Sequence, residues 1–286
     1  MKTIRSNAEM RAYVRAADGS IGLVPTMGAF HAGHRSLIRA ARERCDVVVV
    51  SLFVNPAQFD DAADLEAYPR DETSDAADAA ELGADVLYAP SVEEVYPPGF
   101  ATSVRVEGLS EQLEGAARGP GHFAGVCTVV TKLLNAVTPD VAFFGQKDAQ
   151  QVAVLRRMVR DLDLRVELAV LPTVREPDGL ALSSRNVHLS ADERRRAVAL
   201  SRALRAAESA VAAGEREASA IAGAARAAMN GVELDYLALV DPESFQPVHI
   251  VDGRVLVAVA ARIGATRLID NTIIHPAATP DGAPTT

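Results

Sequence analysis

Short runs of aliphatic residues without polar alternation recur along the first part of the chain and constrain its fold more than any other feature. The runs at 21–25 and 47–53 flank a stretch in which Leu37, Ile38 and Ala41 have helical spacing. An uninterrupted apolar run is typical of a strand covered on both faces, as in a parallel sheet wrapped by helices. The order strand, helix, strand therefore predicts a parallel α/β sheet.

The same alternation continues further along the chain. We expect strands at 85–89, 141–144 and 166–171, and helices at 126–137 and 149–162. Because parallel strands need helical crossovers, this order favours one open sheet with helices on both faces.

The pattern changes after the last of these strands. Turn-forming residues at 175–179 are followed by a long Ala/Arg helix that opens with capping-box spacing at Ser190 and Glu193. A second helix is expected at 217–229, and strands at 234–240, 255–260 and 267–269. The chain therefore predicts a large α/β domain over 1–174 and a smaller α+β domain over 175–286, with a frayed tail from Pro276.

Charge is concentrated in one segment of this chain of 286 residues, whose formal net charge is −9. Residues 60–81 contain nine acidic residues and a single base, Arg70. We interpret this segment as a solvated helix before the strand at 85–89. No arginine stripe is interleaved with aromatic residues and tryptophan is absent, so nucleic-acid binding is disfavoured and a small-molecule substrate favoured.

The sequence also points to a reducing, aqueous compartment. Cys45 and Cys127 each lie among aliphatic residues and are expected to be buried free thiols. The longest aliphatic stretches, 47–54 and 256–261, are far shorter than the ~18–20 residues that span a bilayer, and the N-terminus lacks an apolar signal segment. We therefore expect a cytoplasmic protein that does not bind membranes.

A glycine-rich loop with two histidines, PTMGAFHAGH, follows the first of the apolar runs. His31 and His34 are three residues apart and share one face at a helix N-terminus, while Gly28 and Gly33 allow close approach of a nucleotide. Free backbone N–H groups and imidazoles can then meet a triphosphate. Two unrelated surface histidines are the simpler interpretation of such a pattern, but the carboxyl edge of an α/β sheet favours a ligand site. No P-loop pattern occurs.

Polar residues follow two further strands at the same edge. Asn55 and Gln58 are neutral amides that can hydrogen-bond hydroxyl groups, although Asn55 followed by proline also suits a turn. Lys147 is one of only three lysines, and Asp148 beside it suits ribose hydroxyls. The alternative is a solvated lysine and a helix N-cap. A later loop, 182–186, offers two serine hydroxyls and a guanidinium suited to phosphate.

Several motifs occur in order between Gly22 and Arg195, with fainter similarity to Ile274. They are PTMGAFHAGH, FVNPAQF, YPRD, PGHFAGVCTVVTKLLN, FGQKDAQQ and PTVREPDGLALSSRN. Together they resemble the pantothenate synthetase (pantoate–β-alanine ligase) family of the HxGH nucleotidyltransferase superfamily. The resemblance implies an AMP-forming acid–amino-acid ligase that condenses (R)-pantoate with β-alanine through a pantoyl adenylate, with Mg²⁺ accompanying ATP. It also implies a homodimer with a Rossmann-like N-terminal domain and a smaller C-terminal lid domain.

The resemblance further implies roles for individual residues. His34 is the expected proton donor and His31 its phosphate-binding neighbour, with Lys147 and Arg185 as the other catalytic residues. ATP is expected to contact Met27, Gly28, Ala29, Phe30, His31, Ala32, Gly33, His34, Gly145, Gln146, Lys147, Asp148, Val174, Leu182, Ser183, Ser184 and Arg185. Pantoate and β-alanine are expected to contact Gln58, Gln151, Asn55, Tyr68 and Arg118. The sequence assigns no protein ligand to Mg²⁺ and no base for the β-alanine amine.

One position departs from the family pattern. The family usually reads Arg-Pro-Gly-His-Phe, whereas here Gly119 separates Arg118 from Pro120. The arginine is expected near pantoate and the reaction centre, so either the extra glycine lets Arg118 reach that place or another base substitutes.

Two other classes of protein stay open at this point. Another nucleotidyltransferase, such as a cytidylyltransferase or phosphopantetheine adenylyltransferase, would share H-x-G-H but would not be expected to carry Gln58, Gln151 and the Ser-Ser-Arg-Asn loop together. A noncatalytic nucleotide-binding regulator would need neither both histidines nor Lys147. The joint presence of these residues favours the ligase.

Overall fold

The computed structural model describes residues 1–59 and 62–276, and the predicted frayed tail lies almost entirely outside this range. The chain divides into two compact units. The first consists of Met1–Val174 and Leu182–Ser184, and the second of Arg175–Ala181 and the chain from Arg185 onward. The chain therefore passes between the units three times.

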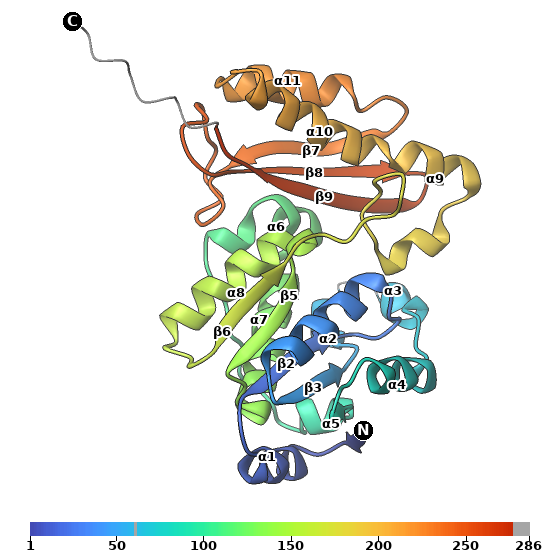
Figure 1. The fold of residues 1–286 in the computed structure, drawn as a ribbon, viewed down its shortest axis with the longest axis vertical. Helices are drawn as coiled ribbons and strands as arrows, with labels where there is room; N and C mark the ends of the chain where they lie inside the picture. The colour runs from blue at the N-terminus through green and yellow to red at the C-terminus, as the bar shows by residue number, and fades with distance from the viewer. Residues whose placement is uncertain (60–61, 277–286) are drawn as a thin grey trace, which may run out of the picture. The chain divides into compact units, whose positions relative to one another are not determined.

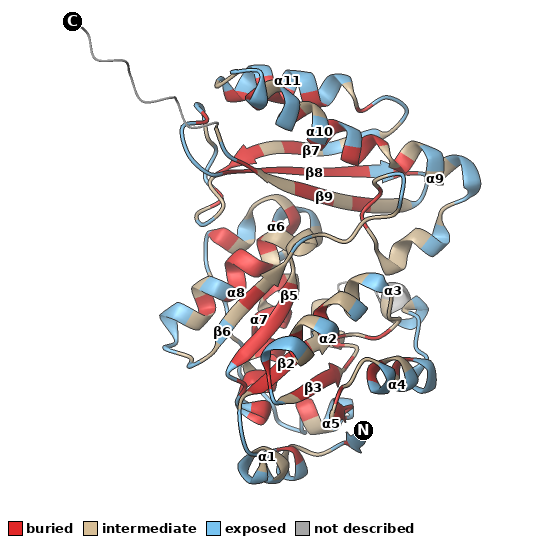
Figure 2. Ribbon diagram, viewed as in Figure 1, coloured by how far each residue is buried: buried red, intermediate tan, exposed pale blue. Residues whose placement is uncertain are grey.

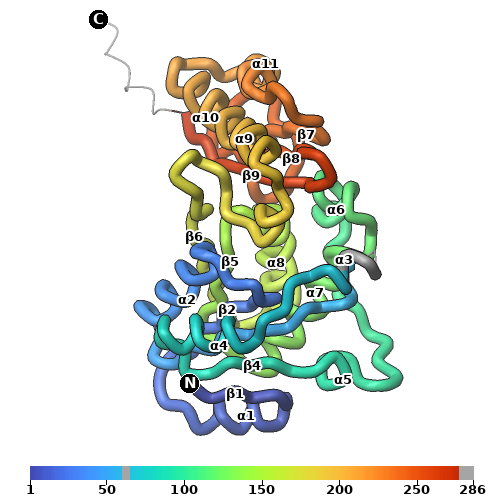
Figure 3. Tube along the Cα trace, turned by 90° about the vertical axis from the view of Figure 1, so that its right-hand side faces the viewer, coloured from blue at the N-terminus to red at the C-terminus, as the bar shows by residue number. Residues whose placement is uncertain are grey.

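The first unit is built on a six-stranded sheet with the order β1-β4-β3-β2-β5-β6 (Figure 1). Its strands are β1 (Lys2–Ile4), β2 (Ile21–Thr26), β3 (Val47–Leu52), β4 (Val86–Tyr88), β5 (Val141–Gly145) and β6 (Glu167–Leu171). Every neighbouring pair is parallel, which confirms the predicted Rossmann-like sheet. The short β1, which lies beside β4 at one edge of the sheet (Figure 3), was not predicted, because only Ile4 of its three residues is buried.

Helices cover the sheet of the first unit. They are α1 (Asn7–Ala16), α2 (Ala32–Arg44), α3 (Ala62–Ala67), α4 (Glu72–Glu81), α5 (Val92–Val95), α6 (Leu113–Arg118), α7 (Pro120–Val137) and α8 (Ala149–Asp161). The helix α2 lies over β2 and β3 and buries Leu37, Ile38 and Ala41, as the spacing predicted (Figure 1). Figure 2 shows the resulting pattern, with buried strands and helices exposed on their outer sides. The helix α7 begins earlier than predicted, with Pro120 in its first turn, a position that proline favours.

The strand order of this sheet reverses between β2 and β5. From β2 the sheet continues through β3 and β4 on one side and through β5 and β6 on the other. Open α/β sheets bind ligands outside the carboxyl ends of the strands at such a reversal. The loops after β2 and β5 both begin there, so the fold itself indicates where to look for the site.

The second unit contains a three-stranded antiparallel sheet covered by helices, and the smaller α+β fold predicted for this part of the chain is confirmed. Its elements are α9 (Ala191–Ala197), α10 (Ala199–Ala212), α11 (Ala218–Ala227), β7 (Glu233–Val240), β8 (Val255–Ile263) and β9 (Thr266–Ile274). The core of the unit joins Leu200 and Leu204 of α10 to Val257 and Val259 of β8. The predicted capping box at Ser190 and Glu193 is present, but the predicted single long helix is two helices.

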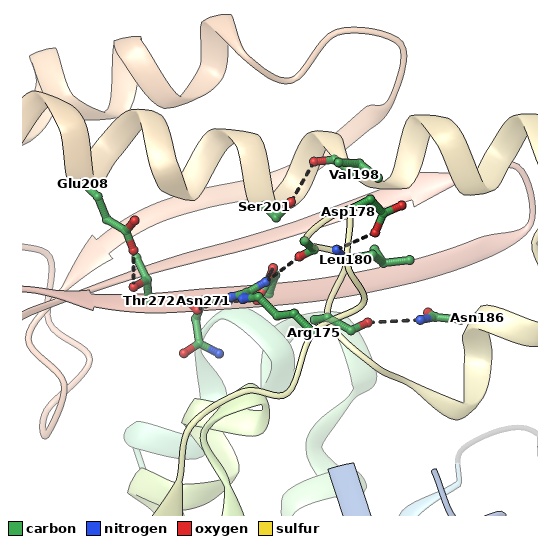
Figure 4. A network of polar contacts seen from close by, with 12 residues as sticks. Arg175, Asp178, Leu180, Asn186, Val198, Ser201, Glu208, Asn271 and Thr272 are labelled. Carbon is green, nitrogen blue, oxygen red and sulfur yellow. Dashed lines mark hydrogen bonds and ion pairs between the residues drawn. The ribbon is translucent and has the colours of Figure 1, made fainter. Parts of the chain in front are cut away.

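A short hairpin, residues 175–181, is tied to the sheet of the second unit. Arg175 donates through both terminal nitrogens to the carboxylate of Asp270 on β9, at 2.6 and 3.0 Å. It also donates to the carbonyl oxygen of the next residue, Asn271, at 3.4 Å (Figure 4). Arg175 also donates to the carbonyl oxygen of Gly179 at 3.1 Å, across the hairpin. Because the side chain of Asp270 is only 2 % exposed, this is a nearly buried, bidentate ion pair.

Two simpler expectations concern the thiols and the membrane. Cys45 and Cys127 are buried free thiols, as predicted, and burial raises the pKa of Cys127 to about 12. Among the helices of residues 1–59 and 62–276, none is both long and apolar enough to cross a membrane.

Candidate active site

Two histidines form the first turn of α2, directly after the loop that follows β2. His31 is the N-cap residue, and its Nδ1 accepts the backbone N–H of Gly33 at 3.1 Å. The Nδ1 of His34 accepts the backbone N–H of His31 at 3.4 Å, which completes a capping box. The two rings stack with their centroids 4.2 Å apart. The histidines therefore begin the helix, and each holds the ring of the other in place.

This arrangement determines where each neutral ring carries its proton. Because both Nδ1 atoms accept from backbone N–H groups, the proton of each neutral imidazole lies on Nε2. Burial, the neighbouring His31 and the Lys147 ammonium lower the pKa of His34 to about 3. Burial and Lys147 also lower the pKa of His31. Both rings are therefore neutral at pH 7 and present Nε2–H donors.

Five backbone N–H groups of the same loop donate within the protein, so for these five the expectation that they would be free for a triphosphate is wrong. Gly28 donates to Thr26 Oγ1, Ala29 and Phe30 to the Asp75 carboxylate, and His31 and Gly33 to the two imidazoles. The backbone turns at Gly28 (φ 90°) and Ala29 (φ 54°), which are both in the left-handed region. This turn directs the N–H groups of Ala29 and Phe30 toward Asp75 of α4.

Asp75 was missed by the sequence analysis, which treated the acidic segment as a solvated face. Asp75 is 3 % exposed, and its carboxylate accepts Ala29 N–H at 2.9 Å and Phe30 N–H at 2.8 Å. A sequence signal did exist, because Asp75 lies four residues before the buried Ala79 and so shares the inner face of α4.

Other acids of the segment also have partners. Asp78 pairs with Arg35 of α2 at 2.7 Å, Glu72 pairs with Arg5, and Asp71 caps the N-terminus of α4. Asp60 and Asp61 lie outside the described residues. The interpretation of the segment as only a solubilising surface is therefore wrong for α4, which helps hold α2 and the loop before it.

The loop after β3 positions Gln58 through Asn55. Asn55 is 1 % exposed, and its amide nitrogen donates to Gln58 Oε1 and to the carbonyl oxygen of Gly125, both at 3.1 Å. Its amide oxygen accepts from Tyr96 at 2.8 Å and from Ala57 N–H at 3.2 Å. The whole hydrogen-bonding capacity of Asn55 is thus used within the protein, which indicates that it acts by holding Gln58.

Gln58 has a second neighbour from α7. The amide nitrogen of Gln58 contacts the Met27 sulfur at 2.9 Å, a weak acceptor that a substrate hydroxyl can replace. His122 Nδ1 lies 2.9 Å from the carbonyl oxygen of Gln58. Because a carbonyl oxygen only accepts, this Nδ1 carries a proton. The sequence predicts no role for His122, which occurs there only as part of the PGHF motif.

The loop after β5 contributes the charged groups. Lys147 Nζ lies 3.6 Å from Asp148 Oδ1, and the Lys147 side chain is 18 % exposed. Both charges act on the pKa values of His31 and His34, so the structure brings these four predicted residues together.

Two consecutive glutamines on α8 have different environments. Gln150 is 4 % exposed and bonds Glu114 N–H and the carbonyl oxygens of Leu109 and Gln112 at 2.8–2.9 Å. Gln151 is half-buried, and its side chain makes no hydrogen bond to any residue that the structure describes. Gln150 therefore fixes the loop before α6, whereas the amide of Gln151 does not hold any described part of the chain in this way.

Arg118 is held within its own helix. Its Nε donates to Glu114 Oε2 at 3.1 Å, one turn earlier in α6. The additional Gly119 ends α6 and begins α7 in a left-handed conformation (φ 84°) that favours glycine. The insertion thus makes a sharp link between two helices immediately after Arg118.

The remaining predicted residues are placed as follows. Val174 accepts the Leu182 N–H at 3.0 Å in the first unit, which also contains Ser183 and Ser184. Arg185 belongs to the second unit. Tyr68 packs edge-on against Phe59, with ring centroids 5.7 Å apart.

A magnesium site made only of protein groups is not found in the described part of the chain, where no three His, Cys, Asp or Glu side chains converge.

Comparison with known proteins gives consistent matches along the chain. The family model described as pantoate-beta-alanine ligase matches residues 2–273. A pantothenate synthetase of Rhizorhabdus wittichii is 53% identical over 97% of this chain and 100% of its own length. A pantothenate synthetase structure from Thermus thermophilus has a TM-score of 0.92 and 47% identity, covering 96% of this chain and 100% of its own. A Francisella tularensis pantoate-beta-alanine ligase, complexed with beta-gamma ATP and beta-alanine, has a TM-score of 0.79 and 34% identity, covering 96% and 97%.

Proposed function

Because this chain belongs to the pantoate–β-alanine ligase family, we propose that the carboxyl edge of its parallel sheet is where pantoate is activated and joined to β-alanine. The reaction is the ATP-dependent condensation of pantoate with β-alanine to pantothenate. The observation that carries the assignment of the site is the stacked pair of neutral imidazoles after β2, facing the charge of Lys147 after β5.

In the first step, a carboxylate oxygen of pantoate attacks the α-phosphorus of ATP. The bond from that phosphorus to the bridging oxygen breaks, and pyrophosphate leaves with the electron pair. Negative charge grows on the phosphate oxygens, so fixed donors are the main catalytic contribution. The Nε2–H groups of His31 and His34 and the ammonium of Lys147 supply such donors.

Neutral histidines are well suited to this task. Because the pKa values of both rings are lowered, no proton has to be taken up before the rings can donate. Triphosphate binding adds negative charge beside the rings and therefore raises both pKa values again. His34 acts in this step as a hydrogen-bond donor: its Nε2–H is shared with an oxygen of the departing pyrophosphate, and the ring stays neutral.

Pantoate is held by neutral amides. Gln58 and Gln151 bind its hydroxyl groups, and Asn55 fixes the side chain of Gln58. Amides suit this role because they donate and accept without titrating and add no repulsive charge near the phosphates. Arg118 attracts the pantoate carboxylate from the end of α6, and Tyr68 lines the site.

ATP is bound along the reversal point of the sheet. Its phosphates lie at the loop 27–34 and at Lys147, and its ribose at Asp148. The adenine lies by the backbone of Val174, and the loop 182–185 closes over the phosphates. Mg²⁺ enters as part of the Mg-ATP substrate, held by phosphate oxygens and water.

In the second step, the neutral amine of β-alanine attacks the acyl carbon of pantoyl adenylate. The carbon–oxygen bond to AMP breaks, AMP leaves with the electron pair, and the nitrogen gives up a proton to water as the amide forms. Gln58 orients β-alanine beside pantoate.

The second unit acts as a lid that keeps water from the adenylate, and the enzyme works as a cytoplasmic homodimer. Light scattering of the purified chain tests the dimer.

The two-step reaction is tested by mixing the enzyme with Mg-ATP, (R)-pantoate and β-alanine, and by omitting each acceptor in turn. We expect pantoate alone to support exchange of labelled pyrophosphate into ATP, and β-alanine to be needed for rapid AMP release. Formation of AMP and pantothenate without any pantoate-dependent exchange would contradict the adenylate. Absence of both activities would contradict the proposed function.

A further inference from the structure

One buried side chain of the acidic helix α4, Asp75, contacts the loop 27–30 between β2 and α2. Asp75 is 3 % exposed, and its two carboxylate oxygens accept from the backbone N–H groups of Ala29 and Phe30 at 2.9 and 2.8 Å. These two residues lie immediately before His31. Hydrogen bonds to an ionised acceptor are about twice as strong as neutral ones, so the carboxylate holds this turn more firmly than a neutral side chain would.

The loop is shaped to receive that carboxylate. Gly28 has φ 90° and Ala29 has φ 54°, both in the left-handed region. A Cβ atom on Gly28 would lie 2.8 Å from Asp75 Oδ2 and 2.8 Å from a methyl carbon of Leu52. Only glycine fits between these side chains. A left-handed alanine costs about 1–2 kcal/mol and persists only when its surroundings hold it.

The same loop sets the position of the histidines. His31 begins α2, and its own N–H donates to His34 while its ring accepts from Gly33. The direction in which the chain leaves Phe30 therefore decides where the His31 ring lies and, through the stacked rings, where His34 lies.

We propose that Asp75 is a positioning residue of the ligase, which holds the turn at Gly28 and Ala29 so that both imidazoles present Nε2–H to the phosphates of ATP. The inference rests on the proposed function of the loop. Asp75 itself touches no phosphate. Its carboxylate occupies the two N–H groups that would otherwise bind an anion, so the phosphates meet the imidazoles instead of the backbone.

The test compares Asp75→Asn with a matched control on the same helix. Asp78→Asn removes the ion pair between α4 and Arg35 of α2 but leaves the loop 27–30 untouched. An asparagine at position 75 keeps the volume but turns an NH₂ group toward one of the two backbone N–H groups. We expect kcat/KM for ATP to fall about 10- to 100-fold in Asp75→Asn, the equivalent of losing one hydrogen bond to a charged group, and to stay within about twofold in Asp78→Asn.

Ring NMR gives a readout that does not depend on turnover. In wild type and Asp78→Asn, the ¹⁵N shifts of His31 and His34 should report neutral rings protonated on Nε2 at pH 7. In Asp75→Asn, the rings should lose this uniform tautomer, and the pKa of His34 should rise toward the ordinary value of about 6.5. Melting temperatures of both variants identify any general loss of folding.

The outcomes separate the two proposals. Equal rates and equal ring shifts in Asp75→Asn and wild type would overturn the positioning role, as would identical losses in Asp75→Asn and Asp78→Asn. A wild-type enzyme without pantoate-dependent exchange would instead contradict the proposed function, and the ring shifts would still decide whether Asp75 positions the histidines.

Discussion

Two ring protons decide what the loop after β2 can do chemically. His31 and His34 use their Nδ1 atoms to begin a helix, which leaves Nε2–H as the only polar hydrogen on each neutral ring. Each imidazole therefore serves two roles with its two nitrogen atoms: Nδ1 caps the helix, and Nε2–H is the proposed donor to phosphate.

Removing one of these donors should slow the chemical step. We expect His34→Gln to lower kcat for pantothenate formation by about 10²–10³, the usual loss for one preorganised donor at a developing charge. The measurement is steady-state AMP release at saturating substrates. His249→Gln, at an exposed position of the second unit, is the control and should keep wild-type turnover. An unchanged kcat in His34→Gln would remove His34 from the catalytic groups.

The lowered pKa of His34 also predicts how stability depends on pH. The folded value of about 3 lies below the unfolded value of about 6.5, so the unfolded chain binds more protons between these limits. The contribution of the neutral ring is complete above pH 6.5 and is lost as the pH falls toward 3. Urea unfolding at pH 7.5 and 5.0 should show a larger loss in wild type than in His34→Gln. Equal losses would show that the ring does not titrate this way.

The turn before the histidines should not accept a side chain. Gly28→Ala should lower the free energy of unfolding by about 1–3 kcal/mol, from the left-handed backbone and the clash with Asp75 and Leu52. Gly145→Ala is the matched control, because its φ is −89° and a Cβ there meets nothing within 4 Å. Urea denaturation should find that control within about 0.5 kcal/mol of wild type. Similar stabilities for both variants would contradict the tight fit.

Helices α7 and α11 each contain an interior glycine, and the reasons differ. A Cβ on Gly125 of α7 would lie 2.1 Å from the carbonyl oxygen of Ala57, whereas a Cβ on Gly223 of α11 meets nothing within 4 Å. Gly125 thus lets α7 approach the turn that contains Gln58, and Gly223 only weakens its helix.

The two glycines should therefore respond to alanine with opposite signs. Gly223→Ala should raise the free energy of unfolding by about 0.5–1 kcal/mol through helix propensity. Gly125→Ala should lower it, because backbone must move. Thermal unfolding followed by circular dichroism measures both. A destabilised Gly223→Ala would mean that propensity does not govern α11.

Elements with long apolar runs were predictable from sequence, and others were not. The positions of β2, β3, β5, α2 and α8 follow directly from periodicity, and the capping box at Ser190 was predicted with its partner. The strand β1 has too few residues to give a pattern. The boundary between α9 and α10 at Val198 has no proline or glycine beside it, so the sequence does not indicate that the helix is interrupted there.

The site was predictable as a set of motifs but not as a hydrogen-bonded arrangement. Local spacing placed His31, His34 and Lys147 at the carboxyl edge, because strand ends fix that edge. The partnership of Asp75 with Ala29 and Phe30 spans more than forty residues of sequence and depends on how α4 packs. Local patterns carry no information about such a contact.

The two units have separate cores, so the molecule should respond locally to a change in one of them. Arg175→Met leaves the buried carboxylate of Asp270 without its bidentate guanidinium, at an expected cost of about 3–5 kcal/mol. Arg194→Met breaks a more exposed pair with Asp178 and should cost at most about 1 kcal/mol.

Amide hydrogen exchange locates these effects. In Arg175→Met, exchange should accelerate in β8 and β9, while β2 and β5 keep their wild-type protection. In Arg194→Met, all four strands should stay close to wild type. Equal acceleration in both sheets would show that the units unfold together.

The threefold passage of the chain between the units also limits how such a gene can recombine. The hairpin 175–181 belongs to the second unit, yet the three residues after it, 182–184, belong to the first. A single genetic crossover therefore cannot separate the two units cleanly: a junction after Val174 gives residues 182–184 of the first unit to the wrong parent, and a junction after Ser184 does the same to the hairpin 175–181 of the second. Exchange of one unit between relatives requires several coordinated junctions, so the two units are expected to be inherited together.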